Sequence, residues 1–360
     1  MKILLLGDYS SLYKNLKEGL VELGHDVIIA SRGDGFKNVA RDIDFLSKKK
    51  GVLGRIETKI LPFLKMDKLR GFDIVQLINP FEFSCKNIHP FFFYKNIINN
   101  NDKFFISAAG DDSFFWRVGR KHLRYGPFDD FLKFDLRKKK FWMESETSFS
   151  FNKWVVNNSN GIIPIMYEYE VSYANEEKRL QTIPIPMNVD NVKYRENSIE
   201  SKIIVFHGLN RYGFKGTRHV EAAFSYLGKK YPNDLELIID GKMPLNKYLE
   251  IMNRANVIID QTNSYSLGVN GVYALAMGKV VMGGGEPESI KSFGVNETPV
   301  INILPSAESI IREVEIIMEK RNQIGGMGYS GRKFAEDVHG HIRIAEKYIS
   351  VWAKEEAQRL

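Results

Sequence analysis

The sequence has 360 residues, of which 44% are hydrophobic and 26% charged, a composition typical of a folded globular protein. Its length predicts two domains of roughly 100–200 residues each. The single cysteine, Cys85, excludes an intrachain disulfide and fits a reducing compartment. The net charge of +7 suits anionic small molecules or an anionic membrane surface, and without clustering it is weak evidence for nucleic-acid binding.

The first half of the chain alternates short apolar runs with helix-like stretches. Residues 2–6 (KILLL) predict a buried first strand, because this apolar run is shorter than that of a signal peptide. Leucines at helical spacing follow and end at Gly24. Further strands are predicted at 26–30, 73–78 and 103–107. This βαβ rhythm predicts a parallel sheet covered on both faces, and no apolar run reaches the ~18 residues of a transmembrane helix.

The same rhythm restarts in the second half. Strands are predicted there at 202–206, 235–239, 256–260, 279–282 and 300–303. We expect an N-terminal Rossmann-like α/β domain over 1–186, a linker over 187–201 and a second such domain over 202–338. Apolar side chains at helical spacing predict a C-terminal helix within 339–360. Parallel sheets of this kind bind ligands at the carboxyl ends of their strands, beside helix N-termini.

The loop after 202–206 carries two cations four residues apart. Arg211 offers a planar fork for phosphate oxygens and Lys215 a mobile point charge, so both can converge on one anion. Gly216 allows close approach of the backbone. A solvated loop that happens to carry two charges is the alternative. The candidate phosphate-binding residues of this loop are Arg211, Lys215, Asn210 and Gly208.

Two further loops offer polar groups. Residues 260–271 connect a strand to a helix and present hydroxyl and amide side chains, although a capped connection without a ligand is the alternative. Residues 283–288 hold three glycines that permit close approach of a ligand, followed by carboxylates. The candidate nucleotide- and sugar-binding residues are Tyr265, Gly268, Val269, Asn270, Tyr273 and Glu288.

These loops resemble the nucleotide-sugar-binding domain of GT-B glycosyltransferases, most of all the retaining family 4. Residues 211–217 look like the Arg…Lys-Gly element that binds the donor diphosphate in that family. Residues 267–281 are similar to its FGL…EAMAxGxPVV run, and 284–288 match its GGxPE turn. Residues 24–27 (GHDV) and 185–190 (IPMNVD) resemble its GHEV and PNGVD, so the resemblance spans nearly the whole chain.

The sequence departs from that family where the donor binds. The family's Glu-x7-Glu pair contacts donor sugar and ribose, and Tyr265 and Tyr273 stand at those two places. Arg211 lies one residue nearer the lysine than the family's arginine, and Asn210 occupies the usual place. These departures leave two explanations open. Either the chain binds the donor through different contacts, or it is a non-catalytic relative.

The resemblance places the acceptor on the N-terminal half. Residues 73–82 resemble a strand and loop that carry DVVHxH, and 108–113 resemble an HGxD loop with Ala109 at the usual histidine. Asp111 is the candidate catalytic residue, and a helix cap is the alternative for Asp111 and Asp112. The candidate acceptor-side residues are Gly7, Asp8, Ser10 and Asp112. No His or Cys spacing suggests a metal site.

Basic and aromatic side chains are interleaved over 131–142. Five basic residues and one acidic residue give 133–142 a net charge of +4. Such a segment can lie on anionic lipid headgroups, and a solvated charged face is the alternative.

Together these features predict a two-domain GT-B glycosyltransferase with its two sheets facing a cleft and the C-terminal helix returning to the first domain. It would transfer a sugar from a nucleotide diphosphate-sugar to a saccharide or lipid-linked acceptor in cell-surface polysaccharide synthesis. Retention at the anomeric carbon follows from the resemblance alone. We expect no metal or other cofactor, no nucleic-acid partner, and a cytoplasmic location at the inner membrane face. A non-catalytic nucleotide-sugar-binding relative and a GT-B nucleotide-sugar epimerase are the alternatives.

Overall fold

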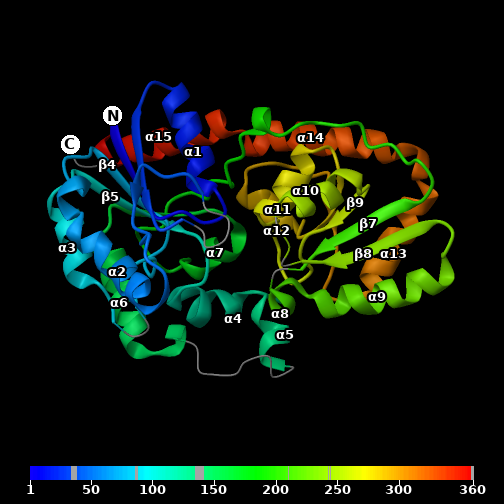
Figure 1. Cartoon of the computed structure of the whole chain (residues 1–360), viewed down its shortest axis with the longest axis horizontal. Coiled ribbons are helices and arrows are strands. Elements are labelled where there is room, and N and C mark those ends of the chain that lie inside the picture. Colours follow the sequence, from blue (N-terminus) through cyan, green and yellow to red (C-terminus); the bar gives the residue numbers. More distant parts are fainter. Residues whose placement is uncertain are drawn as a thin grey trace. The chain divides into compact units, whose positions relative to one another are not determined.

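Figure 1 shows the computed structural model, which describes residues 1–33, 39–85, 88–133, 142–209, 211–241, 243 and 245–357. The chain forms two compact units. Unit 1 consists of residues 1–122, 140–188 and 341–360, and unit 2 of residues 123–139 and 189–340. The chain therefore passes between the units after residues 122, 139, 188 and 340.

Unit 1 is built on a parallel sheet with the strand order β3-β2-β1-β4-β5-β6. Its strands are β1 (Lys2–Leu6), β2 (Asp26–Ser31), β3 (Ile43–Asp44), β4 (Ile74–Leu77), β5 (Lys103–Ala108) and β6 (Gly161–Pro164). In the register of the sheet, Leu4 of β1 lies between Ile28 of β2 and Val75 of β4. Because helices cover both faces of such a sheet, the central strand β1 is apolar and buried from Ile3 to Leu6 and needs no polar alternation.

The helices of unit 1 enclose an aromatic-rich core. They are α1 (Leu12–Glu22), α2 (Gly51–Leu64), α3 (Phe91–Asn99), α4 (Arg120–His122), α6 (Glu146–Asn157), α7 (Tyr167–Ser172) and α15 (His341–Ala357), with short helical turns at Met66–Leu69, Phe115–Gly119 and Trp142–Glu144. The core gathers Phe83, Phe93, Tyr94 and Phe151 with the leucines and valines of the central strands.

The C-terminal helix α15 packs on α1, as Figure 1 shows in red beside blue. The Trp352 indole nitrogen donates a 3.0 Å hydrogen bond to Gln76 Oε1 of β4, and Lys103 Nζ donates one to the Trp352 carbonyl. Gly19 packs against the start of α15, where a Cβ would collide with the His341 carbonyl oxygen. The last helix thereby completes the core of the first unit.

Unit 2 is built on a second parallel sheet, with the strand order β11-β10-β9-β7-β8. Its strands are β7 (Ile203–Gly208), β8 (Leu235–Asp240), β9 (Val257–Ile259), β10 (Val280–Gly283) and β11 (Ile301–Asn302). Its helices are α5 (Phe128–Lys133), α8 (Tyr212–Lys215), α9 (Thr217–Lys230), α10 (Leu245–Arg254), α11 (Val269–Ala276), α12 (Pro287–Ser292), α13 (Ala307–Glu319) and α14 (Ile324–His339), with short turns at Val189–Asn191 and Arg321–Gln323.

Two helix-covered parallel sheets confirm the α/β fold class predicted from the βαβ rhythm. Strands β3 and β6 were not predicted, because β3 has two residues and β6 is a four-residue run that begins with a glycine and ends with a proline. Within the described residues, no helix has both the length and the apolar character needed to span a membrane.

Candidate functional site

The loops that the sequence analysis singled out follow the central strands of unit 2. β7 lies inside the sheet, with β8 on one side and β9 on the other, so the strand order reverses between β7 and β9. Ligands of open parallel sheets bind at the carboxyl ends of the strands at such a switch point. Loops 209–216 and 260–268 follow these two strands.

Asp260 joins the two loops at this point. The residue is 2% exposed, and its Oδ1 lies 3.0 Å from Lys215 Nζ. Its Oδ2 accepts a 2.7 Å hydrogen bond from the backbone amide of Gly268. Gly268 immediately precedes α11, whose N-terminus carries a partial positive charge. The carboxylate therefore holds an ammonium group beside a helix N-terminus, and both attract anions.

A glycine and a buried histidine fix the backbone before α9. Gly216 has a φ of +68°, and a Cβ there would collide with the Thr262 hydroxyl, so only glycine fits. His207 donates from Nδ1 to the Ile259 carbonyl at 2.9 Å and accepts at Nε2 from the Thr217 hydroxyl at 3.0 Å. Burial, and then the charge of Lys215, lower the His207 pKa to about 4. The neutral imidazole thus links β7, β9 and α9.

Of the other predicted phosphate-binding residues, Gly208 ends β7 and Arg211 lies in the loop after it. The Arg211 guanidinium lies over the Phe214 ring, 3.7 Å from the ring centroid. A Cβ at Gly208 would lie 2.5 Å from the Tyr248 hydroxyl, so a side chain at this position would displace Tyr248. Asn210 lies outside the described residues.

The remaining residues predicted to bind the nucleotide lie on α11. Val269 and Asn270 form its first turn and are partly exposed. Amides in a first helical turn have no acceptor within the helix, so they are available to a ligand. Tyr273 lies one turn further along, and burial raises the pKa of its phenol.

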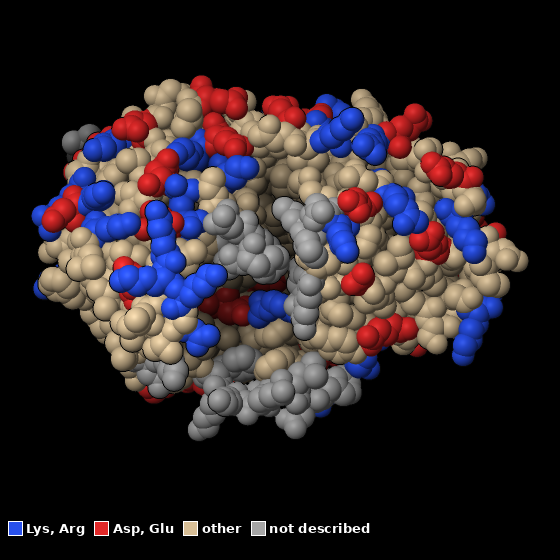
Figure 2. All heavy atoms as spheres, viewed as in Figure 1, with Lys and Arg blue, Asp and Glu red and all other residues tan. Residues whose placement is uncertain are grey.

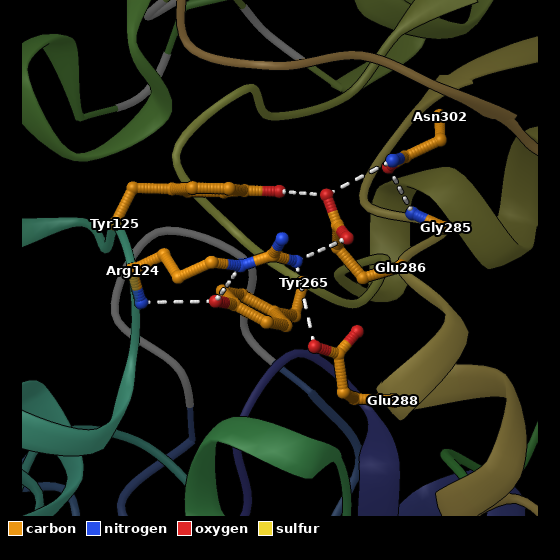
Figure 3. Close-up of polar contacts among 7 residues, drawn as sticks. All are labelled: Arg124, Tyr125, Tyr265, Gly285, Glu286, Glu288 and Asn302. Atoms are coloured by element: carbon orange, nitrogen blue, oxygen red, sulfur yellow. Dashed lines mark hydrogen bonds and ion pairs between the residues drawn. The ribbon is translucent and has the colours of Figure 1, made fainter.

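A second polar cluster surrounds Glu286, in the loop after β10 (Figure 3). One oxygen of this buried carboxylate accepts hydrogen bonds from the Tyr125 hydroxyl at 2.6 Å and from Asn302 Nδ2 at 3.0 Å. The other lies 2.7 Å from Arg124 Nη2. Burial alone would raise the pKa of Glu286, but the hydrogen bonds from Tyr125 and Asn302 and the charge of Arg124 outweigh it and lower the pKa. Glu286 is therefore a fixed anion.

Tyr265 belongs to the same cluster and is 2% exposed. Its hydroxyl accepts two hydrogen bonds from Arg124, at 2.9 Å from the backbone amide and at 3.1 Å from Nε. Glu288 on α12 lies 3.4 Å from Arg124 Nη2. One arginine thus ties the loop after β9 to the loop after β10.

Arg124 and Tyr125 were missed by the reasoning from sequence. They precede α5, in the segment of unit 2 that is farthest in sequence from its sheet. Their partners Tyr265 and Glu286 follow 141 and 161 residues later. No local spacing or composition marks the two residues, because only the tertiary fold brings them to these loops.

The predicted acceptor-side residues of unit 1 lie in the loops after β1 and β5, two strands that flank β4 in the sheet. Gly7 and Ser10, in the loop after β1, have left-handed backbones, with φ values of +86° and +53°. Asp8 is buried between them, and its Oδ1 accepts a 2.9 Å hydrogen bond from the Tyr13 amide in the first turn of α1. The side chain of Asp8 therefore stabilises the start of α1.

Asp111 and Asp112 follow β5 and have different surroundings. Asp112 is buried, and it accepts hydrogen bonds from the Phe115 amide at 2.8 Å and the Tyr173 hydroxyl at 2.6 Å. Burial raises its pKa to about 6. The capping alternative thus describes Asp112, whereas Asp111 is partly exposed. The carbonyl of Asp111 accepts a 3.4 Å hydrogen bond from Asn79, which follows β4.

Two further expectations concern metals and lipids. Among the described residues, no group of three or more His, Cys, Asp or Glu side chains is arranged to hold a metal ion. Residues 134–141, which carry most of the charge of the basic segment 131–142, lie outside the described residues.

Solved structures match this fold over nearly the whole chain. Sucrose-phosphate synthase from Thermosynechococcus elongatus matches with a TM-score of 0.66 and 13% identity, covering 99% of this chain and 100% of that one. Anabaena HepE in complex with UDP and glucose matches with a TM-score of 0.62 and 11% identity, covering 98% of this chain and 100% of that one. UDP-GlcNAc 2-epimerase from Neisseria meningitidis, bound to UDP-GlcNAc, matches with a TM-score of 0.54 and 11% identity, covering 98% of this chain and 100% of that one. No family model and no curated protein matches the sequence. The chain has the GT-B fold.

Proposed function

We propose that the chain is a glycosyltransferase that transfers a sugar from a nucleotide diphosphate-sugar to a saccharide or lipid-linked acceptor. The observation that carries the proposal is the Asp260 carboxylate, which holds Lys215 beside the N-terminus of α11 at the switch point of a parallel sheet. A diphosphate carries the negative charge that a lysine and a helix N-terminus together stabilise. The UDP in the HepE structure supports uridine nucleotides as the first donors to test.

In this proposal, the protein stabilises the leaving group. The bond between the anomeric carbon and the diphosphate oxygen breaks, and negative charge develops on the nucleoside diphosphate. A bond forms between the anomeric carbon and an acceptor hydroxyl oxygen, whose proton is released to solvent. Lys215, Arg211 and the first-turn amides of α11 supply the opposing positive charge. We expect no metal to be required, because this charge comes from the protein, and the resemblance to family 4 implies retention at the anomeric carbon.

We assign the donor sugar to the region between α11 and the Glu286 cluster. The resembled family has carboxylates where Tyr265 and Tyr273 stand. Glu286 is a buried anion that holds Arg124, and Arg124 in turn contacts Tyr265, so a largely exposed guanidinium lies near the first of these places and can bind sugar hydroxyls. Glu288 flanks the same guanidinium, and Tyr273 is assigned to the nucleotide.

We assign the acceptor to the loops after β1 and β5 of unit 1. Asp111 is the candidate catalytic carboxylate there, because it is partly exposed whereas Asp112 is buried and accepts two hydrogen bonds. The proposed part in cell-surface polysaccharide synthesis rests on the family resemblance.

Product analysis separates the transferase from the two alternatives. The chain is incubated with UDP-glucose or UDP-GlcNAc, with and without saccharide acceptors, and the sugars are followed by NMR. A transferase releases UDP and transfers the sugar, or slowly hydrolyses the donor when no acceptor is present. An epimerase yields an altered sugar without any acceptor, and a binding protein binds the donor and leaves it intact. Either of these outcomes would replace the proposal.

A further inference from the structure

Helix α2 of unit 1 exposes most of its large apolar side chains. Val52 is 69% exposed, and Leu53 and Leu64 are each 71% exposed. The exposed set along the helix comprises Val52, Leu53, Ile56, Ile60, Phe63 and Leu64. Exposed apolar surface that is contiguous in this way is uncommon on proteins with no partner and marks an interaction site.

The exposed side chains form a stripe on the side of α2 that faces away from the core. At about 100° of rotation per residue, the six fall within about 120° of one another around the helix axis. Gly54 and Pro62 are buried, Leu61 packs partly on the core, and all three lie on the opposite side. An amphipathic helix of a globular unit normally buries its apolar stripe, whereas α2 presents it to solvent.

The sequence around this stripe is strongly basic. Residues 48–70 contain eight basic and two acidic side chains, a net charge of +6. Lys48–Lys50 precede α2, Arg55 and Lys59 border the stripe, and Lys65, Lys68 and Arg70 follow it. In Figure 2, Lys and Arg side chains gather over the part of unit 1 where Figure 1 places α2, beside uncharged surface.

The first turn of α3 adds exposed aromatic rings next to the end of α2. Phe63 of α2 and Phe93 of α3 have ring centroids 5.4 Å apart, so the two helices meet there. Phe91 and Phe92, at the start of α3, are both exposed. Aromatic side chains are common where amphipathic helices enter a membrane interface.

We infer that α2 and the first turn of α3 form a docking surface for an anionic lipid bilayer. The apolar stripe would lie at the boundary between headgroups and acyl chains, with the surrounding lysines and arginines on anionic headgroups. The charge selects this occupant, because a second copy of the chain would bring the same cluster of positive charge against itself. The inference rests on residues other than the basic segment 131–142, and it is independent of the proposed function.

Co-sedimentation with lipid vesicles tests the apolar stripe. The full chain should bind phosphatidylcholine vesicles that contain about a third phosphatidylglycerol, should bind pure phosphatidylcholine vesicles weakly, and should dissociate as salt rises. Leu53→Glu combined with Leu64→Glu should reduce the partition onto anionic vesicles by at least about tenfold. Leu304→Glu changes an exposed leucine of unit 2 and should leave it unchanged.

A second pair of variants tests the charge. Lys48→Glu with Lys50→Glu should weaken binding to the anionic vesicles by about tenfold or more. Lys193→Glu with Lys229→Glu alters the total charge by the same amount on exposed positions of unit 2, and should retain binding. Equal loss in both pairs would show that total charge alone drives binding, and would overturn the assignment to α2.

Two other results would also overturn the inference. One is a wild-type chain that stays in the supernatant with anionic vesicles, or apolar variants that sediment like wild type. The other is a lipid-free dimer, seen by light scattering, that the same apolar substitutions dissociate, because a second copy would then cover the stripe. Circular dichroism verifies that each variant is folded. Calorimetry with UDP measures nucleotide binding separately from membrane binding. A failure of the lipid-docking proposal is therefore distinguishable from a failure of the proposed glycosyltransferase function.

Discussion

Asp112 and His207 are buried titratable residues whose pKa values shift in opposite directions. Burial raises the Asp112 pKa from 3.8 to about 6, so between these values the folded state holds a proton that the unfolded state releases. Its contribution to the free energy of unfolding is therefore lost as the pH rises through this window. The His207 pKa falls from 6.5 to about 4, so the contribution of His207 is lost as the pH falls.

The substitution Asp112→Asn isolates one of these opposing effects. Asparagine keeps an acceptor for the Phe115 amide and does not titrate, while His207 is unchanged in both proteins. We expect the free energy of unfolding of the variant, relative to wild type, to rise by roughly 1–3 kcal/mol between about pH 4 and pH 7. Urea unfolding followed by tryptophan fluorescence measures it, because all four tryptophans belong to unit 1. A difference that does not vary with pH would contradict the assignment.

Arg124 should matter more for the sugar than for the nucleotide. Arg124→Met removes the guanidinium that ties Tyr265 to Glu286, both of which we place near the donor sugar. We expect the affinity for UDP-glucose to fall about fivefold, a small effect because the arginine is largely exposed, and the affinity for UDP to change little. Calorimetry measures both. Arg254→Met is the control, since Arg254 is equally exposed and pairs with Glu236 in the same unit. Parallel losses for UDP and UDP-glucose would refute the role in sugar binding.

The residues of the candidate site that could be predicted from sequence lie in local patterns. Lys215, Gly216 and Gly268 stand in short connections between a strand and a helix, where charge and glycine spacing are visible along the chain. The partnership of Lys215 with Asp260 spans 45 residues, and the contacts of Arg124 span more than 140. Such contacts depend on which strands become neighbours in the sheet. The local sequence around each residue does not indicate that.

At the scale of elements, the packing of α15 on α1 depends on Gly19. Alanine stabilises a helix interior by about 1 kcal/mol relative to glycine. A Cβ at Gly19, however, would collide with the His341 carbonyl, and overpacking against a rigid backbone costs about 1–3 kcal/mol or more. We expect Gly19→Ala to lower the free energy of unfolding by about 1–2 kcal/mol, measured by tryptophan fluorescence.

Gly228→Ala on α9 is the matched control for Gly19→Ala. The nearest atom to a Cβ at Gly228 is Leu237 Cδ1 at 3.7 Å, an ordinary van der Waals contact. The helix-propensity gain should therefore dominate, and the variant should be as stable as wild type or slightly more stable by circular dichroism. The packing argument fails if both substitutions change stability in the same direction and by the same amount.

Elements with a clear apolar pattern could be predicted from the sequence. Whether an apolar helix face packs on the core or faces solvent could not. The run KILLL at 2–6 predicts β1 because its four consecutive apolar residues suit a sheet covered on both sides. Helix α2 also has apolar residues at helical spacing, but spacing does not say whether a stripe faces the core or solvent. In α2 that choice follows from Gly54 and Pro62, which occupy the packing side.

For the whole molecule, the βαβ rhythm and its restart after residue 200 were enough to predict two parallel α/β sheets. The inclusion of residues 123–139 in unit 2 was not predictable, because this segment interrupts the sequence of unit 1. The described part of this segment, residues 123–133, packs through tertiary contacts: Phe128 and Phe131 lie against Phe214, and Asp130 pairs with Arg218 at 3.2 Å.

We propose that Lys215 and the N-terminus of α11 bind the diphosphate of a sugar nucleotide. Isothermal titration of UDP and other nucleoside diphosphates into the wild-type chain and into Lys215→Ala measures this binding. We expect at least one of them to bind the wild type, and Lys215→Ala to lose about 1.5–3 kcal/mol, or roughly 10- to 150-fold in affinity. Lys229→Ala, an exposed lysine of the same unit, should bind like wild type. Equal affinity in wild type and Lys215→Ala, or no binding of any nucleoside diphosphate to the wild type, would contradict the account.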